Sequence, residues 1–93
     1  MGETRRLVRN TEIIHAPVGQ EELVMLSVEA GRYYSVNPVG RRLWELLEQQ
    51  RSRDELRAAI CAEFDVDEPT CEVDIQKFVA EMMDNGLVHD ADA

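Results

Sequence analysis

The sequence has little of what enzymes and membrane proteins usually need. Its apolar runs are short, as at Leu23–Leu26, and none approaches the roughly 20 residues that cross a bilayer. The five glycines are scattered, so no glycine-rich loop is present to hold a phosphate. Neither His15 nor His89 has a nucleophile and a carboxylate beside it in the spacing of a catalytic triad. We therefore expect no enzymatic activity, no metal ion and no other cofactor.

Cysteine is also scarce, and there is no sign of a secretory signal. The two thiols, Cys61 and Cys71, lack CxxC spacing and have no histidine nearby in the sequence. The charged N-terminal residues 1–10 are not followed by an apolar segment, as they would be in a signal peptide. These features predict reduced, structural cysteines and a cytoplasmic protein.

Basic residues are missing from the last third of the chain. The formal net charge is −9; residues 1–58 hold nine arginines and nine acids, whereas residues 59–93 hold ten acids and Lys77 alone. An acidic segment of this kind repels a phosphate backbone. It serves either as a solvated face that aids solubility or as a docking surface, and composition alone does not decide between the two.

The pattern that is present predicts three strands. At 93 residues the chain is long enough for one small domain. From residue 10, short apolar stretches around 13–14, 21–29 and 32–36 are separated by turn residues, with Gly31 suited to a tight hairpin. The alternation predicts an inward-facing set on these strands: Val24, Leu26, Val28, Tyr34 and Val36. Tyr33 and Ser35 are then expected on the outside.

Three helices are predicted to follow. Asn37 and Pro38 form a helix start, and Ser52 to Glu55 is a capping box. A third helix is expected from Glu68 or Pro69 to a stop at 85–86. The fold class is therefore α+β and winged-helix-like, a three-stranded antiparallel sheet followed by three helices. We expect residues 9–88 to form the domain, with a flexible N-terminus at 1–8 and a flexible tail at 89–93.

A winged-helix fold raises the possibility of DNA binding. The third predicted helix would be the recognition helix, but it carries acids at 72, 74, 81 and 84 against the single Lys77. Phosphate contacts need basic side chains, so a DNA-binding regulator is a minor alternative. Neither nucleic acid nor a membrane is expected as a partner.

Peptide capture fits the pattern better. The third predicted strand is an edge with free backbone groups, and an extended peptide can pair with such an edge. The third helix has an apolar stripe that includes Phe78 and the adaptable Met82. Such a stripe either forms pockets for peptide side chains or is simply part of the core.

Three stretches of the chain read GRYYSVNPVGRRLWELL, SRDELRAAICAEFDVD and MMDNGLV. They resemble the PqqD-like family, the small RiPP recognition elements that bind the leader of a ribosomally made precursor peptide, and the similarity extends from about residue 8 to residue 88. The resemblance implies a non-catalytic peptide chaperone whose third strand takes up the leader as an antiparallel strand against the third helix. The residues so implied for peptide binding are Arg32, Tyr33, Tyr34, Ser35, Val36, Asp74, Ile75, Phe78, Val79 and Met82.

The sequence of residues 31–47 is most similar to the sequences of the stand-alone leader-binding proteins of split lasso-peptide biosynthesis. That similarity implies two enzyme partners, a leader peptidase of the cysteine-protease type and an ATP-dependent macrolactam synthetase. The alternative within the family is a peptide chaperone of the pyrroloquinoline quinone pathway, working with a radical SAM enzyme.

Overall fold

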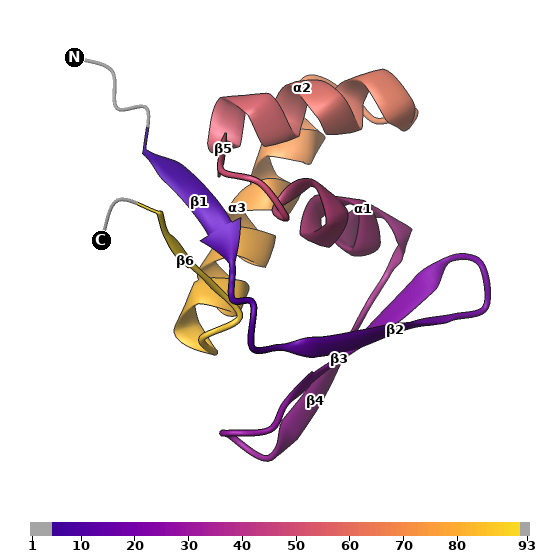
Figure 1. Ribbon diagram of the computed structural model, residues 1–93. Helices are drawn as coiled ribbons and strands as arrows, with labels where there is room; N and C mark the ends of the chain where they lie inside the picture. Colours follow the sequence, from indigo (N-terminus) through magenta and orange to yellow (C-terminus); the bar gives the residue numbers. More distant parts are fainter. Residues whose placement is uncertain (1–4, 92–93) are drawn as a thin grey trace.

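The computed structural model describes residues 5–91, which form two small antiparallel sheets and three helices (Figure 1). The sheets have the strand orders β2-β3-β4 and β5-β1-β6. The elements are β1 (Arg6–Arg9), β2 (Ile14–Val18), β3 (Glu22–Ser27), β4 (Arg32–Val36), α1 (Pro38–Leu46), β5 (Arg51–Ser52), α2 (Arg53–Glu63), α3 (Glu68–Asp84) and β6 (Val88–Asp90). The predicted α+β fold, a three-stranded sheet followed by three helices, is confirmed.

In the sheet β2-β3-β4, the face of β3 that we expected to point outward is the one that points into the core. Leu23 and Met25 are buried, whereas Leu26 is 37% exposed and Val28 is 65% exposed. Alternation defines two faces but does not say which is covered, and β3 has apolar residues on both. Tyr34 pairs with Met25 and is half-buried, as Val36 is, so on β4 the predicted inner and outer positions are correct.

The outer face of this sheet remains open to solvent. Ile14, Leu26 and Tyr33 lie directly opposite one another across its three strands and all three are exposed. Val18 on β2 is exposed as well. The sheet therefore has one face in the core and one apolar face that no described residue covers.

Local hydrogen bonds mark the starts of α1 and α2 and the end of α3. The side chain of Asn37 accepts a bond from the N–H of Gly40 at 2.8 Å, which caps α1. Ser52 and Glu55 form the predicted reciprocal capping box of α2. At the end of α3, Gly86 has a φ of +75° and Leu87 folds back, its N–H donating to the Met82 carbonyl at 2.8 Å.

The second sheet, β5-β1-β6, corrects the expectation of loose chain ends. Residues 6–8 belong to β1 and residues 89–90 to β6, and the two strands pair with each other, Leu7 opposite Asp90. Leu7 and Val88 are almost completely buried. These strands are too short for a clear alternation, and each finds its partner only in a distant part of the chain. Residues 1–4 and 92–93 of the predicted ends lie outside the described residues.

Trp44 joins the sheets to the helices. It is 1% exposed, and its Nε1–H donates to Nδ1 of His15 on β2 at 3.2 Å. The guanidinium of Arg9 on β1 lies over the indole, 5.2 Å from the ring centroid, and donates to the Trp44 carbonyl at 3.2 Å. One side chain of α1 thus contacts a strand of each sheet. None of the helices formed by residues 5–91 is long and apolar enough to cross a membrane.

Candidate functional site

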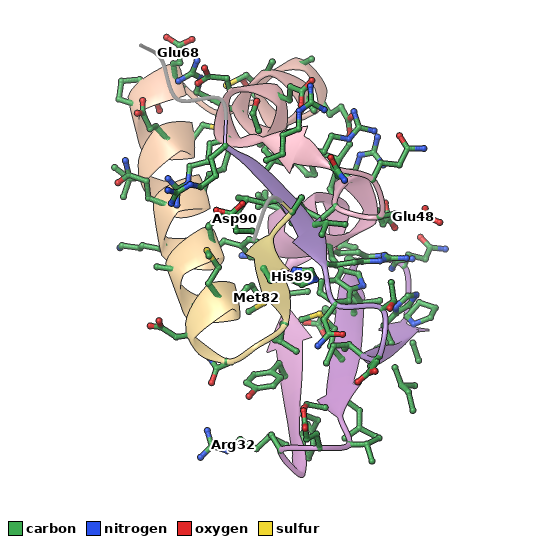
Figure 2. All side chains as sticks on the ribbon, turned by 60° about the vertical axis from the view of Figure 1, so that its left-hand side comes forward. Arg32, Glu48, Glu68, Met82, His89 and Asp90 are labelled. Atoms are coloured by element: carbon green, nitrogen blue, oxygen red, sulfur yellow. The ribbon has the colours of Figure 1, made fainter. Side chains whose placement is uncertain are left out.

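A groove of about 300 Å³ lies between β4 and α3 and is closed on one side by α1. Figure 2 shows α3, which carries Met82, beside the hairpin whose turn is marked by Arg32. The three elements contribute a strand end, an apolar helix face and a charged helix face. The lining residues are Ser35, Val36 and Asn37, then Val39, Gly40 and Leu43, then Asp74, Lys77, Phe78 and Glu81.

The strand that borders the groove is a sheet edge. Within the described residues β4 pairs with β3 alone, so its other side is unpaired. The Ser27 carbonyl accepts a bond from the N–H of Gly31 at 2.9 Å, so it points toward β4, and Ser27 lies opposite Arg32. Because backbone groups alternate in direction along antiparallel strands, Tyr33 and Ser35 direct their N–H and C=O groups toward the unpaired side.

The floor of the groove is apolar and depends on a close approach of α1 to β4. Val36, Val39 and Phe78 are half-buried there, and Leu43 is buried beneath them. Gly40 makes the approach possible, because a Cβ on this residue would lie 2.8 Å from the Cβ of Val36. A side chain at position 40 would push the first turn of α1 away and widen the floor.

The α3 wall carries all the charge of the groove. Asp74, Lys77 and Glu81 are exposed and follow one side of the helix at intervals of three and four residues. None of them takes part in the ion pairs of 4 Å or less found among residues 5–91. The β4 and α1 sides contribute no charged residue to the lining, so the groove is electrostatically one-sided.

The structure brings together only part of the predicted site. Ser35, Val36, Asp74 and Phe78 line the groove, but Arg32, Tyr33 and Tyr34 extend from it along β4. The other predicted helix residues are in the core beneath the groove, each at most 3% exposed: Ile75, Val79 and Met82. They support Phe78 and do not form the groove surface.

Sequence reasoning missed the α1 contribution and two charged residues. The approach of Val39, Gly40 and Leu43 to β4 is a tertiary contact with no local signal. Lys77 and Glu81 did carry a signal, since they lie three and seven residues after Asp74 and therefore share its side of a helix.

The buried Cys71 is not a reactive thiol. Burial, reinforced by the neighbouring Cys61 thiol, raises the pKa of Cys71 to about 11, so Cys71 is protonated at neutral pH. Its thiol donates to the Arg57 carbonyl at 3.9 Å. Among the residues that the structure describes, no three His, Cys, Asp or Glu side chains gather to hold a metal ion.

The groove has three features suited to binding another molecule: an unpaired strand edge, an apolar floor and a charged wall.

Comparison with known proteins points the same way. The family described as coenzyme PQQ synthesis protein D (PqqD) matches residues 22–88. A solved structure of TbiB1 in complex with the TbiA(beta) leader peptide is 33% identical, has a TM-score of 0.78, and is matched over 88% of this chain and 94% of that one.

A second solved structure, lasso peptide synthetase B1 complexed with the leader peptide, shares the fold. Its TM-score is 0.75 over 89% of this chain and 96% of that one, at 22% identity. The comparison with curated proteins gives no match.

Proposed function

The chain belongs to the PqqD family, and from this premise we propose that it is a non-catalytic leader-binding protein, a RiPP recognition element. The observation that carries the proposal is the unpaired side of β4 facing the apolar floor of the groove. It is supported by the 33% identical TbiB1, whose solved structure contains a leader peptide.

The leader would bind as an added antiparallel strand on β4. Tyr33 and Ser35 would exchange backbone hydrogen bonds with it, and every second leader side chain would point toward the floor at Val36 and Phe78. The hairpin turn and the Asn37 cap hold both ends of β4 before the peptide arrives. Little ordering of this edge is then needed on binding, which favours affinity.

The precursor is proposed to be that of a lasso peptide. This agrees with the sequence of residues 31–47 and with the fold shared with a lasso peptide synthetase B1. The bound leader would be presented in the cytoplasm to a leader peptidase of the cysteine-protease type and to an ATP-dependent macrolactam synthetase. The name of the matched family favours a second candidate, a peptide chaperone of the pyrroloquinoline quinone pathway working with a radical SAM enzyme.

A titration tests the proposal. The labelled leader of a short precursor encoded beside the gene is titrated with the protein and followed by fluorescence anisotropy, with duplex DNA as a control. We expect saturable binding of the leader in the micromolar range or tighter and none of DNA. DNA binding without leader binding would instead assign the domain to the winged-helix regulators.

A pair of variants at one position tests the mode of binding. Ser35→Pro removes the N–H that faces the leader and should weaken binding about tenfold or more, because a peptide carbonyl loses its partner. Ser35→Ala keeps the N–H and should bind like the wild type. Equal affinity of a folded Ser35→Pro variant would place the leader elsewhere on the protein.

A further inference from the structure

The charged wall of the groove bears on which leaders the protein accepts. Asp74 and Glu81 flank Lys77 on the side of α3 that lines the groove, and the facing residues of β4 and α1 are uncharged. Within the groove, a charge on a bound peptide would therefore meet charged residues of α3 alone. The resulting pattern along the wall is negative, positive, negative.

The two acids are available to a ligand. The arginines at 5, 41, 42 and 57 pair with other carboxylates, and those pairs do not include Asp74 or Glu81. Lys77 comes four residues before Glu81, the less favourable order for a helical ion pair, and the two do not form one of the ion pairs of 4 Å or less in the described structure. A basic side chain from a peptide would thus gain an ion pair without breaking one.

The spacing of the two acids fits an extended peptide. Asp74 and Glu81 are seven residues apart on α3, a rise of roughly 10 Å. In a strand added to β4, side chains that point the same way recur about every 7 Å, so positions i and i+4 are about 13 Å apart. Lysine and arginine side chains are long and flexible enough to cover the difference. Position i+2 then lies near Phe78, which is between the two acids on the helix.

Resting on the proposed function, we propose that the groove selects leader segments of the form basic-x-apolar-x-basic. The two basic side chains pair with Asp74 and Glu81, one at each end of the wall, and the apolar side chain enters the floor beside Phe78. Lys77 repels a basic side chain at the middle position. The acidic surface of α3 then selects among leader peptides and is not only an aid to solubility.

Selection from a displayed library of random peptides tests this without knowledge of the natural leader. The wild-type protein should enrich peptides with lysine or arginine at two positions four residues apart and an apolar residue midway. The Asp74→Lys variant should lose the basic preference at one of these positions only, and Glu81→Lys at the other only. Asp84→Lys, the same change on an α3 residue outside the groove lining, should keep both preferences.

Affinity measurements complete the test. A peptide enriched by the wild type should bind the Glu81→Lys variant about tenfold more weakly, with Asp84→Lys unchanged, because a like charge replaces an attractive one. Thermal melting confirms that each variant is folded. Enrichment of apolar peptides without any charge preference would overturn the charge filter and leave the proposed function standing. No enrichment over background by the wild type would count against peptide binding itself.

Discussion

The two sheets of this domain each have three strands but differ in the origin of those strands. β2, β3 and β4 follow one another along the chain through short turns, whereas β5-β1-β6 joins both ends of the described chain to its middle (Figure 1). The first sheet leaves Ile14, Leu26 and Tyr33 exposed, and the second buries Leu7 and Val88. The first sheet leaves one edge and one face open, and the second brings both ends of the described chain into the core.

This difference predicts that the second sheet serves stability, whereas the first has one face in the core and an outer face and free edge left for binding. Long-range pairs hold the helices and termini together around Leu7, so damage there should spread through the domain. The β2-β3-β4 sheet is held at its base by the Trp44 contacts and by the Asn37 cap. Its outer face and free edge contribute little to folding and are available for contacts with other molecules.

The largest effect is expected from Leu7→Ala. Leu7 is 1% exposed, so its truncation should lower the free energy of unfolding by about 2–5 kcal/mol. The matched change Leu26→Ala, on the open face of the other sheet, should cost less than about 1 kcal/mol, since surface truncations leave no cavity. Urea denaturation measures both, and equal losses would show that the outer face of the first sheet contributes as much to stability as the buried side of the second.

A smaller effect is expected where the first sheet is anchored. His15→Ala removes the acceptor of the buried Trp44 Nε1–H and should lower the free energy of unfolding by about 1–2 kcal/mol. His89→Ala, an exposed histidine on β6, should change it by less than about 0.5 kcal/mol. Indole fluorescence follows both unfolding transitions. The anchor would be unimportant if the two histidine variants melted alike.

Of the three tests, the smallest loss of stability is expected from removing a helix cap. The two cap variants should nevertheless differ in leader binding. Asn37→Ala and Ser52→Ala each remove an N-cap bond and should cost about 1 kcal/mol. Asn37 joins β4 to α1 and lines the groove, whereas Ser52 belongs to β5. Only Asn37→Ala should therefore weaken leader binding in the anisotropy titration. A similar loss of affinity in both variants would mean that the groove responds to general destabilisation.

The sequence predicted those parts of the structure that rest on neighbouring residues. The caps at Asn37 and Ser52 and the stop at Gly86 were all found, because each is a hydrogen-bond pattern within a few residues. β1 and β6 were missed, because strands of four and three residues are too short to show an alternation and do not reveal a partner at the far end of the chain. The buried face of β3 was assigned wrongly, since both of its faces are apolar.

The groove was predicted in outline for the same reason. Its strand edge and Phe78 could be recognised from local patterns of alternation and helical spacing. The contribution of α1 depends on the close contact between Gly40 and Val36, which only the folded chain reveals. Ile75 and Val79 belonged to the same stripe as Phe78, and the sequence could not tell which part of the stripe faces the core.

The pairing of Leu7 with Asp90 has a consequence for synthesis. On the ribosome, β1 emerges long before β6, so the pairing of β1 with β6 has to wait until residue 90 has been made. The hairpins of β2-β3-β4 need only near neighbours and can form earlier. Because the groove also needs α3, a nascent chain would display the proposed binding edge before it has the α3 wall. The proposed discrimination among peptides would then be acquired only when translation of the domain is nearly complete.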